Sequence, residues 1–173
     1  MKLLLKQLFI TGVLLLTFCS QGHAAEATER YRLAGLPTTS ADVLAQLAND
    51  ANATVRQRVA SNRKTPAKIL MNLARDADLA VRIAVATNLS SNENTYLVLA
   101  RDPEQAVRSV VARFEYVPVP ALILLSNDPD VDVRLEVARN LNTTKAILHA
   151  LIKDKNNNVS SVAEQALTRL AEE

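Results

Sequence analysis

The sequence has few of the residues that carry most enzyme and metal chemistry. Its 173 residues include one cysteine, two histidines, three glycines and no tryptophan, and aromatic residues make up 3%. The cysteine, one histidine and two glycines precede residue 24, after which we expect a leader to be removed. The remaining chain has no thiol for a disulfide, a nucleophile or a metal site. Its only histidine is His149 and its only glycine is Gly35. We therefore expect no enzyme activity, no metal and no cofactor.

An excess of charge of one sign is also lacking. Hydrophobic residues make up 49% of the chain, which excludes a disordered protein, and the formal net charge is only +2. Lys2 and Lys6, in the expected leader, account for this excess, so the mature chain is neutral. Because a neutral chain lacks the basic footprint that nucleic acids attract, we expect no nucleic-acid partner.

The first 24 residues have the pattern of a secretory signal peptide. The two lysines precede an apolar run from Leu8 to Phe18, and small residues flank His23 before the expected cleavage after Ala24, with Ala27 as a later option. The run is too short for a membrane span. We expect a periplasmic protein. As an alternative, residues 16–19 resemble a lipobox, in which case Cys19 would carry a lipid anchor in the cell envelope.

An internal repeat of 26 residues follows, with no insertion or deletion. In each unit the apolar residues fall into two helical patterns, such as Val43, Leu44 and Leu47 followed by Val55 and Val59, so each unit predicts a helical hairpin. The recurring residues are Leu47, Leu73, Leu99, Leu125 and Leu151; Asp50, Asp76, Asp102, Asp128 and Asp154; Val55, Val81, Val107, Val133 and Val159; and Arg56, Arg82, Arg108 and Arg134.

Polar residues at the ends of these patterns predict helix caps. Thr65 before Pro66, and Thr39 with Asp42 three residues later, predict N-caps of first helices. We expect the recurring aspartate to cap the second helix of each unit, because its carboxylate can accept hydrogen bonds from the unpaired backbone N–H groups of the first turn. The asparagines that recur where the second helix ends predict a left-handed stop. These are Asn62, Asn88 and Asn140.

The pattern resembles the HEAT repeat and its bacterial relative, the leucine-rich repeat variant. These families share a sequence motif in which Leu-Ala-x-Asp is followed, after four residues, by Val-Arg and then by Val-Ala. The motif occurs here as Leu73 to Asp76, Val81-Arg82 and Val85-Ala86, and the resemblance covers about residues 29–167. It implies a superhelical stack of helix pairs that binds proteins. The founding variant proteins hold an iron–sulfur cluster through cysteines, which we do not expect in a mature chain without cysteine.

We accordingly predict an all-α, right-handed α-solenoid with eleven helices over residues 25–173. A lone N-terminal capping helix ends at Gly35, and polar replacements such as Ser160 and Glu164 suit a terminal unit. The predicted divisions are a cap at 25–37, repeats at 38–63, 64–89, 90–115, 116–141 and 142–167, and a helix end at 168–173.

The recurring arginines and aspartates predict a structural ladder between units. Arg30 has no aspartate in its own unit and Asp154 has no arginine in its own, so every residue finds a partner only when each arginine pairs with the aspartate of the next unit. The predicted pairs are Arg30 with Asp50, Arg56 with Asp76, Arg82 with Asp102, Arg108 with Asp128, and Arg134 with Asp154. A pair at every unit favours a structural role over catalysis.

Two sets of residues are candidates for binding another protein or peptide of the cell envelope. Outward positions of the second helices predict an apolar strip of Ile83, Val110 and Leu135 with a basic edge of Arg113 and Arg139, on the concave face. Scattered surface residues are the alternative interpretation of this strip.

The second candidate is the segment 114–120, where the residues depart from the repeat pattern of the other units. We expect Phe114, which replaces the asparagine, to change the turn, and the residues before Pro118 and Pro120 to delay the next helix to about Pro120. Phe114 and Tyr116 would contact a partner there or, alternatively, fill a bend in the stack.

These patterns favour a periplasmic adaptor that binds another envelope protein. An inhibitor or immunity protein that blocks a secreted enzyme or toxin is the alternative. The sequence does not identify the partner.

Overall fold

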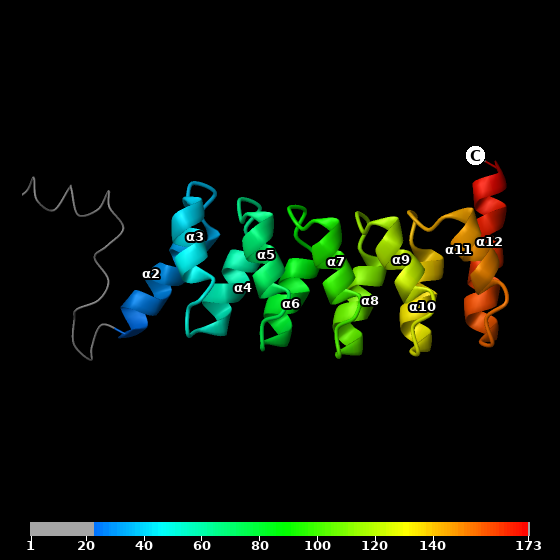
Figure 1. Cartoon of the computed structure of the whole chain (residues 1–173), viewed down its shortest axis with the longest axis horizontal. Helices are drawn as coiled ribbons and strands as arrows, with labels where there is room; N and C mark the ends of the chain where they lie inside the picture. The colour runs from blue at the N-terminus through cyan, green and yellow to red at the C-terminus, as the bar shows by residue number, and fades with distance from the viewer. Residues whose placement is uncertain (1–22, 173) are drawn as a thin grey trace, which may run out of the picture.

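The structure, a computed structural model, describes residues 23–172. Within this range it contains eleven α-helices and no strand, which confirms the predicted all-α class (Figure 1). Most of the predicted signal peptide, including Cys19, the residue predicted to carry a lipid anchor in the alternative interpretation, lies outside the described residues. No helix within the described range is long and apolar enough to span a membrane.

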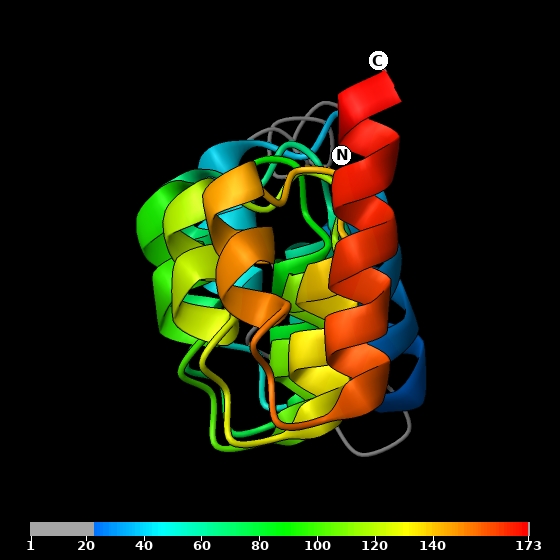
Figure 2. The same ribbon diagram turned by 90° about the vertical axis from the view of Figure 1, so that its right-hand side faces the viewer.

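The helices form a row of two layers (Figures 1 and 2). In the first-helix layer each helix has seven residues and starts 26 residues after the one before: α3 (Ala41–Leu47), α5 (Ala67–Leu73), α7 (Glu93–Leu99), α9 (Val119–Leu125) and α11 (Lys145–Leu151). The second-helix layer contains α2 (His23–Gly35), α4 (Ala53–Ser61), α6 (Leu79–Ala86), α8 (Gln105–Arg113), α10 (Val131–Arg139) and α12 (Asn157–Glu172).

The core lies between the layers, because helices this short are marginal without tertiary contacts. The recurring valines of the second helices, such as Val81 and Val107, are fully buried. Each second helix contacts the second helix before and after it, while α5, α7 and α9 are in contact within the first-helix layer. Tyr96 replaces a core leucine and is 3% exposed. Apolar contacts between successive units therefore supply most of the stability.

The predicted caps of the first helices are wrong at two positions. α3 begins after Ser40, whose hydroxyl accepts the Val43 N–H, and Pro66, with no side-chain cap, precedes α5. The hydroxyls of Thr39 and Thr65 instead donate to the carbonyls of Leu33 and Val59, six residues earlier. These threonines close the loop behind the preceding helix, so they are not available to the helix that follows.

The recurring aspartates are not the N-caps of the second helices, contrary to the prediction. The caps lie two residues later, for example Asp78 before α6 and Asp130 before α10. The Oδ1 atom of Asp76 accepts the N–H of Asp78 at 2.9 Å, and Asp128 accepts that of Asp130 in the same way. Each recurring aspartate therefore closes a turn in the loop and keeps its second oxygen for another partner.

The predicted left-handed stop at the recurring asparagines is also wrong. Asn62 (φ −77°, ψ 121°) and Asn140 (φ −68°, ψ 131°) are extended, and so is Phe114 (φ −66°, ψ 128°). Because this backbone suits any residue, Phe114 does not change the turn. The next helix is not delayed: α9 begins at Val119, in register with the other first helices.

Candidate functional site

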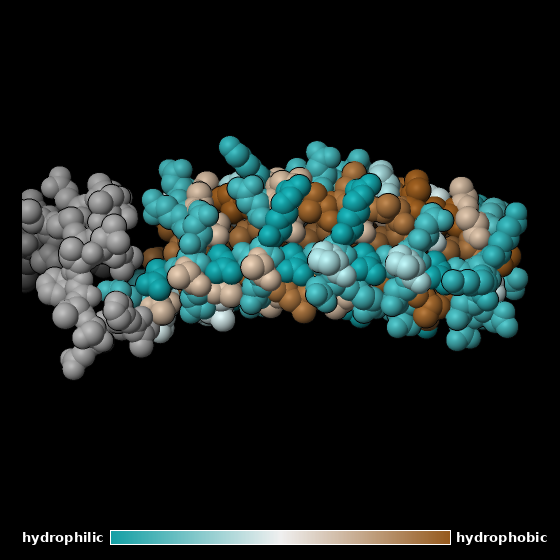
Figure 3. All heavy atoms as spheres, turned by 60° about the horizontal axis from the view of Figure 1, so that its bottom comes forward, coloured by the Kyte–Doolittle hydropathy of each residue, from teal (hydrophilic) through white to brown (hydrophobic). Residues whose placement is uncertain are grey.

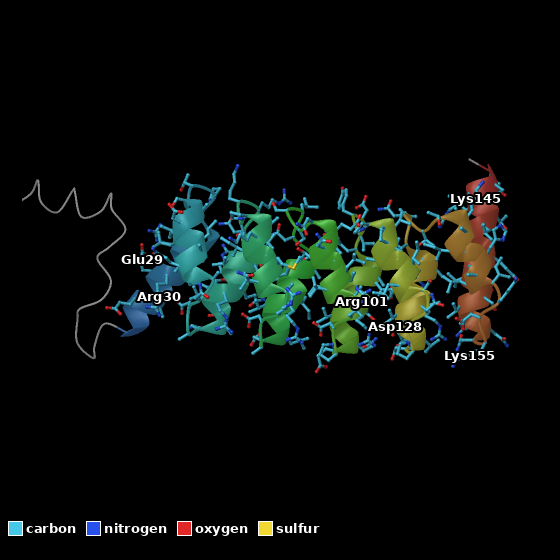
Figure 4. The ribbon with its side chains drawn as sticks, in the orientation of Figure 1. Glu29, Arg30, Arg101, Asp128, Lys145 and Lys155 are labelled. Atoms are coloured by element: carbon cyan, nitrogen blue, oxygen red, sulfur yellow. The ribbon has the colours of Figure 1, made fainter. Side chains whose placement is uncertain are left out.

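The structure brings all five predicted arginine–aspartate pairs together along one edge of the stack. Each Nε atom lies 2.6–2.7 Å from an aspartate Oδ2 atom of the next unit. Figure 4 labels Asp128 and Lys155 near this edge, and Lys145 at the opposite edge. We call the ten residues the arginine–aspartate ladder: Arg30, Asp50, Arg56, Asp76, Arg82, Asp102, Arg108, Asp128, Arg134 and Asp154.

In the pairs other than Arg30–Asp50, the arginine also donates a hydrogen bond to the loop of its own unit. Arg82 binds Asp102 through Nε and Nη2, and its Nη1 donates to the carbonyls of Asp76 and Ala77 at 2.8 and 3.2 Å. The side chains of Arg82 and Asp102 are only 10% and 3% exposed. One buried guanidinium thus joins two consecutive loops and satisfies backbone carbonyls, which is a structural role.

The ladder changes the pKa of its members in the direction expected for ion pairs. Hydrogen bonding to the aspartate raises the pKa of Arg56, Arg82, Arg108 and Arg134 above the ordinary range. The hydrogen bond from Arg56 lowers the pKa of Asp76, and that from Arg134 lowers the pKa of Asp154. These carboxylates are therefore stabilised in the charged form in the folded chain.

We expect this ladder to make the fold sensitive to acid. Because the pKa of Asp76 and Asp154 lies below the ordinary 3.8 in the folded chain, the unfolded chain takes up protons first as the pH falls. The free energy of unfolding is then highest above about pH 5 and declines below about pH 4. Urea titrations at several pH values measure it, and Asp154→Asn gives a shallower decline. An unfolding free energy that stays constant on acidification would contradict this prediction.

A second set of contacts, along the opposite edge, was not predicted from the sequence. The side-chain amide of Asn88 donates to the carbonyls of Ala60 and Asn62 at 2.6 and 3.0 Å, and its Oδ1 accepts the Ser90 N–H. Asn62 and Asn140 make the same bonds to the loop of the preceding unit. We call these three residues the asparagine ladder. Their 26-residue recurrence was the signal, but it does not reveal where a side chain points.

The asparagine ladder is interrupted at the aromatic residues. Phe114 occupies the asparagine position, and its ring stacks on Tyr96 with centroids 6.1 Å apart. The Tyr96 hydroxyl donates to the Asn88 carbonyl at 3.4 Å, one of the acceptors that an asparagine would have bound. Burial raises the pKa of Tyr96 to about 12. Tyr116 meets Phe114 edge-on at 5.8 Å, so the three rings form a continuous cluster.

The predicted strip on the second helices presents little free apolar surface. Ile83, Val110 and Leu135 are half-buried and pack against the core, because the second helices contact one another so closely. Arg113 and Arg139 are exposed, and Arg139 lies 3.6 Å from Glu136 of its own helix.

Several exposed large apolar side chains lie elsewhere. Tyr116, Val119 and Ile123 are 61%, 36% and 53% exposed, and we call them the α9 surface. Leu89 and Leu141, on the α6–α7 and α10–α11 loops, are 50% and 70% exposed. Only Tyr116 was among the predicted binding residues. Val119 and Ile123 were missed because an apolar helix of seven residues does not show from its sequence which positions face the core.

A groove also lies on the first-helix layer. It has a volume of about 400 Å³ between α3 and α5 and is lined by Ala45, Lys68, Ile69 and Asn72, among others. In Figure 3 the loops of the arginine–aspartate ladder form a hydrophilic row, and hydrophobic residues gather above it over the first-helix layer. No group of metal-binding side chains occurs among residues 23–172, and His149 is exposed.

A scan against protein-family models gives no match, and a search of curated proteins gives no significant match.

Proposed function

We propose that this chain is a non-enzymatic adaptor that binds another protein of the cell envelope. The proposal includes export to the periplasm by the signal peptide of residues 1–24. It also includes the finer architecture, a right-handed α-solenoid of five 26-residue helix pairs of the HEAT or leucine-rich repeat variant type. The regular 26-residue register of the first helices and the contacts between consecutive second helices support this architecture.

The α9 surface is the observation that carries the proposal. Tyr116, Val119 and Ile123 expose a large apolar area on a scaffold that is held at both edges by hydrogen bonds between units. Within the described part of the chain, every buried side-chain nitrogen and oxygen has a hydrogen-bond partner. A rigid scaffold loses little conformational entropy on binding, and exposed aromatic side chains are the usual centres of binding energy. The α9 surface therefore suits a protein partner.

A photo-crosslinking residue at position 123, introduced in the cells that make this protein, tests the proposal. We expect one discrete protein adduct, because Ile123 lies at the contact. The adduct decreases at least about fivefold when Tyr116→Ser removes a neighbouring apolar contact, which corresponds to about 1 kcal/mol.

The same residue at position 110 or 135 provides the comparison with the predicted strip on the other layer. Adducts that form at 110 or 135 but not at 123 would show that the partner binds the second-helix layer. Absence of a discrete adduct at all three positions would overturn the proposal.

A further inference from the structure

The exposed charges of the first-helix layer are mostly positive, although the mature chain is neutral. The helices of this layer, with the two residues after each, expose five cations and two carboxylates: Lys68, Arg75, Arg101, Lys145 and Lys153, with Asp42 and Glu93. None of the five cations forms an ion pair within residues 23–172. In the second-helix layer, by contrast, Arg32 and Arg139 pair with carboxylates of their own helices.

Two of these cations are held in place over the layer. Arg75 and Arg101, one residue beyond the caps of α5 and α7, each donate Nη1 to a backbone carbonyl four residues earlier, at 3.2 and 2.9 Å. The Nη1 of Arg75 also donates to the Sδ of Met71 at 3.3 Å. The Nε and Nη2 groups of both arginines make no hydrogen bond within the described range, so they are free to bind a carboxylate. Arg101 is labelled in Figure 4.

Apolar residues follow a parallel line one helical turn away. Met71, Leu97 and Ile123 occupy the same position in α5, α7 and α9, four residues before Arg75, Arg101 and Asn127. Ile123 is 53% exposed, whereas Met71 and Leu97 are half-buried, so they present only part of their side chains to a partner. Adjacent packed helices are spaced by about 8–10 Å, and two turns of an α-helix, seven residues, advance by roughly 10 Å. A helix lying across the layer would therefore place every seventh residue opposite successive units.

We infer that the partner presents an acidic amphipathic helix that lies across α5, α7 and α9. Its heptad-spaced apolar side chains contact Met71, Leu97 and Ile123, and its adjacent line of carboxylates binds Arg75 and Arg101. The inference rests on the proposed function and deepens it by naming the class of partner. In an extended chain about three residues span the same distance of roughly 10 Å, and side chains three residues apart point to opposite sides of the chain. A helix therefore fits better than an extended segment.

Binding of the full chain to a designed helical peptide, with leucines and adjacent glutamates at heptad spacing, tests this inference. An isomer with its glutamates moved to the opposite side of the helix is the control peptide. We expect the first peptide to bind at least about tenfold more tightly, and Arg75→Glu with Arg101→Glu to remove this difference. Arg63→Glu with Arg169→Glu, which makes the same change in charge at exposed positions outside this layer, leaves binding within about twofold. Arg75→Gln with Arg101→Gln provides a milder variant, and circular dichroism verifies that each variant folds.

Equal affinity for the two peptides, or insensitivity to both arginine variants, would overturn the inference. So would binding of the chain to phosphatidylglycerol vesicles with the same dependence on Arg75 and Arg101, since that result identifies an anionic membrane as the occupant. A discrete protein adduct at position 123 in either case leaves the proposed function standing. If neither the adduct at position 123 nor binding of the designed peptide is observed, both the proposed function and this inference are wrong.

Discussion

Replacement of Arg82 by alanine is expected to lower the free energy of unfolding by about 3–5 kcal/mol. The substitution removes the hydrogen-bonded cation from the carboxylate of Asp102, which is only 3% exposed, and it leaves the carbonyls of Asp76 and Ala77 without this donor. Urea denaturation followed by circular dichroism measures the loss, provided that the transition is two-state.

Arg30→Ala provides the matched control at the end of the ladder. The Arg30 side chain is 28% exposed and that of Asp50 is 7% exposed, so solvent replaces the missing pair only in part and the expected loss is about 1–2 kcal/mol, less than for Arg82→Ala. Joint replacement of Arg82 by methionine and Asp102 by leucine is expected to cost less than Arg82→Ala alone, because no uncompensated charge remains. Equal losses for Arg30→Ala and Arg82→Ala would show that burial does not determine the energy of these pairs.

Asn88→Ala is expected to lower the free energy of unfolding by about 2–4 kcal/mol. The carbonyls of Ala60 and Asn62 both lose a donor in a buried loop, and the N–H of Ser90 loses its acceptor. The same urea titration measures this loss.

Asn127→Ala is the matched control, because Asn127 is exposed and its amide donates only to the carbonyl of Ile123 and the hydroxyl of Ser126, both near it on the surface. The expected change is within about 0.5 kcal/mol. A loss for Asn88→Ala as small as this would mean that water replaces the asparagine, and that this ladder contributes little to the contact between units.

The helical class and the partners of the arginines could be predicted because both follow from periodicity. The 26-residue step sets the helix register. Because Arg30 has no aspartate and Asp154 has no arginine in its own unit, only pairing between consecutive units gives every ladder residue a partner. Neither conclusion needs the three-dimensional position of any single side chain.

The caps and the binding surface could not be predicted, because they depend on where a side chain points. Threonine and asparagine suit a helix cap and a loop contact equally well, and the choice at Thr65 and Asn88 is made by carbonyls that only the fold brings near. For the same reason the strip at Val110 was predicted as surface. The close contacts between successive second helices cover part of the positions that a helical projection places outside.

The pairing of each arginine with a residue 20 positions ahead also governs how such a gene can change in length. Removal of one whole 26-residue module would bring Arg56 opposite Asp102 and leave no partnerless charge, whereas a shorter deletion would break the ladder and shift every later helix. Duplication or loss of whole modules therefore preserves the ladder, and so do point substitutions at exposed positions outside the proposed binding surface.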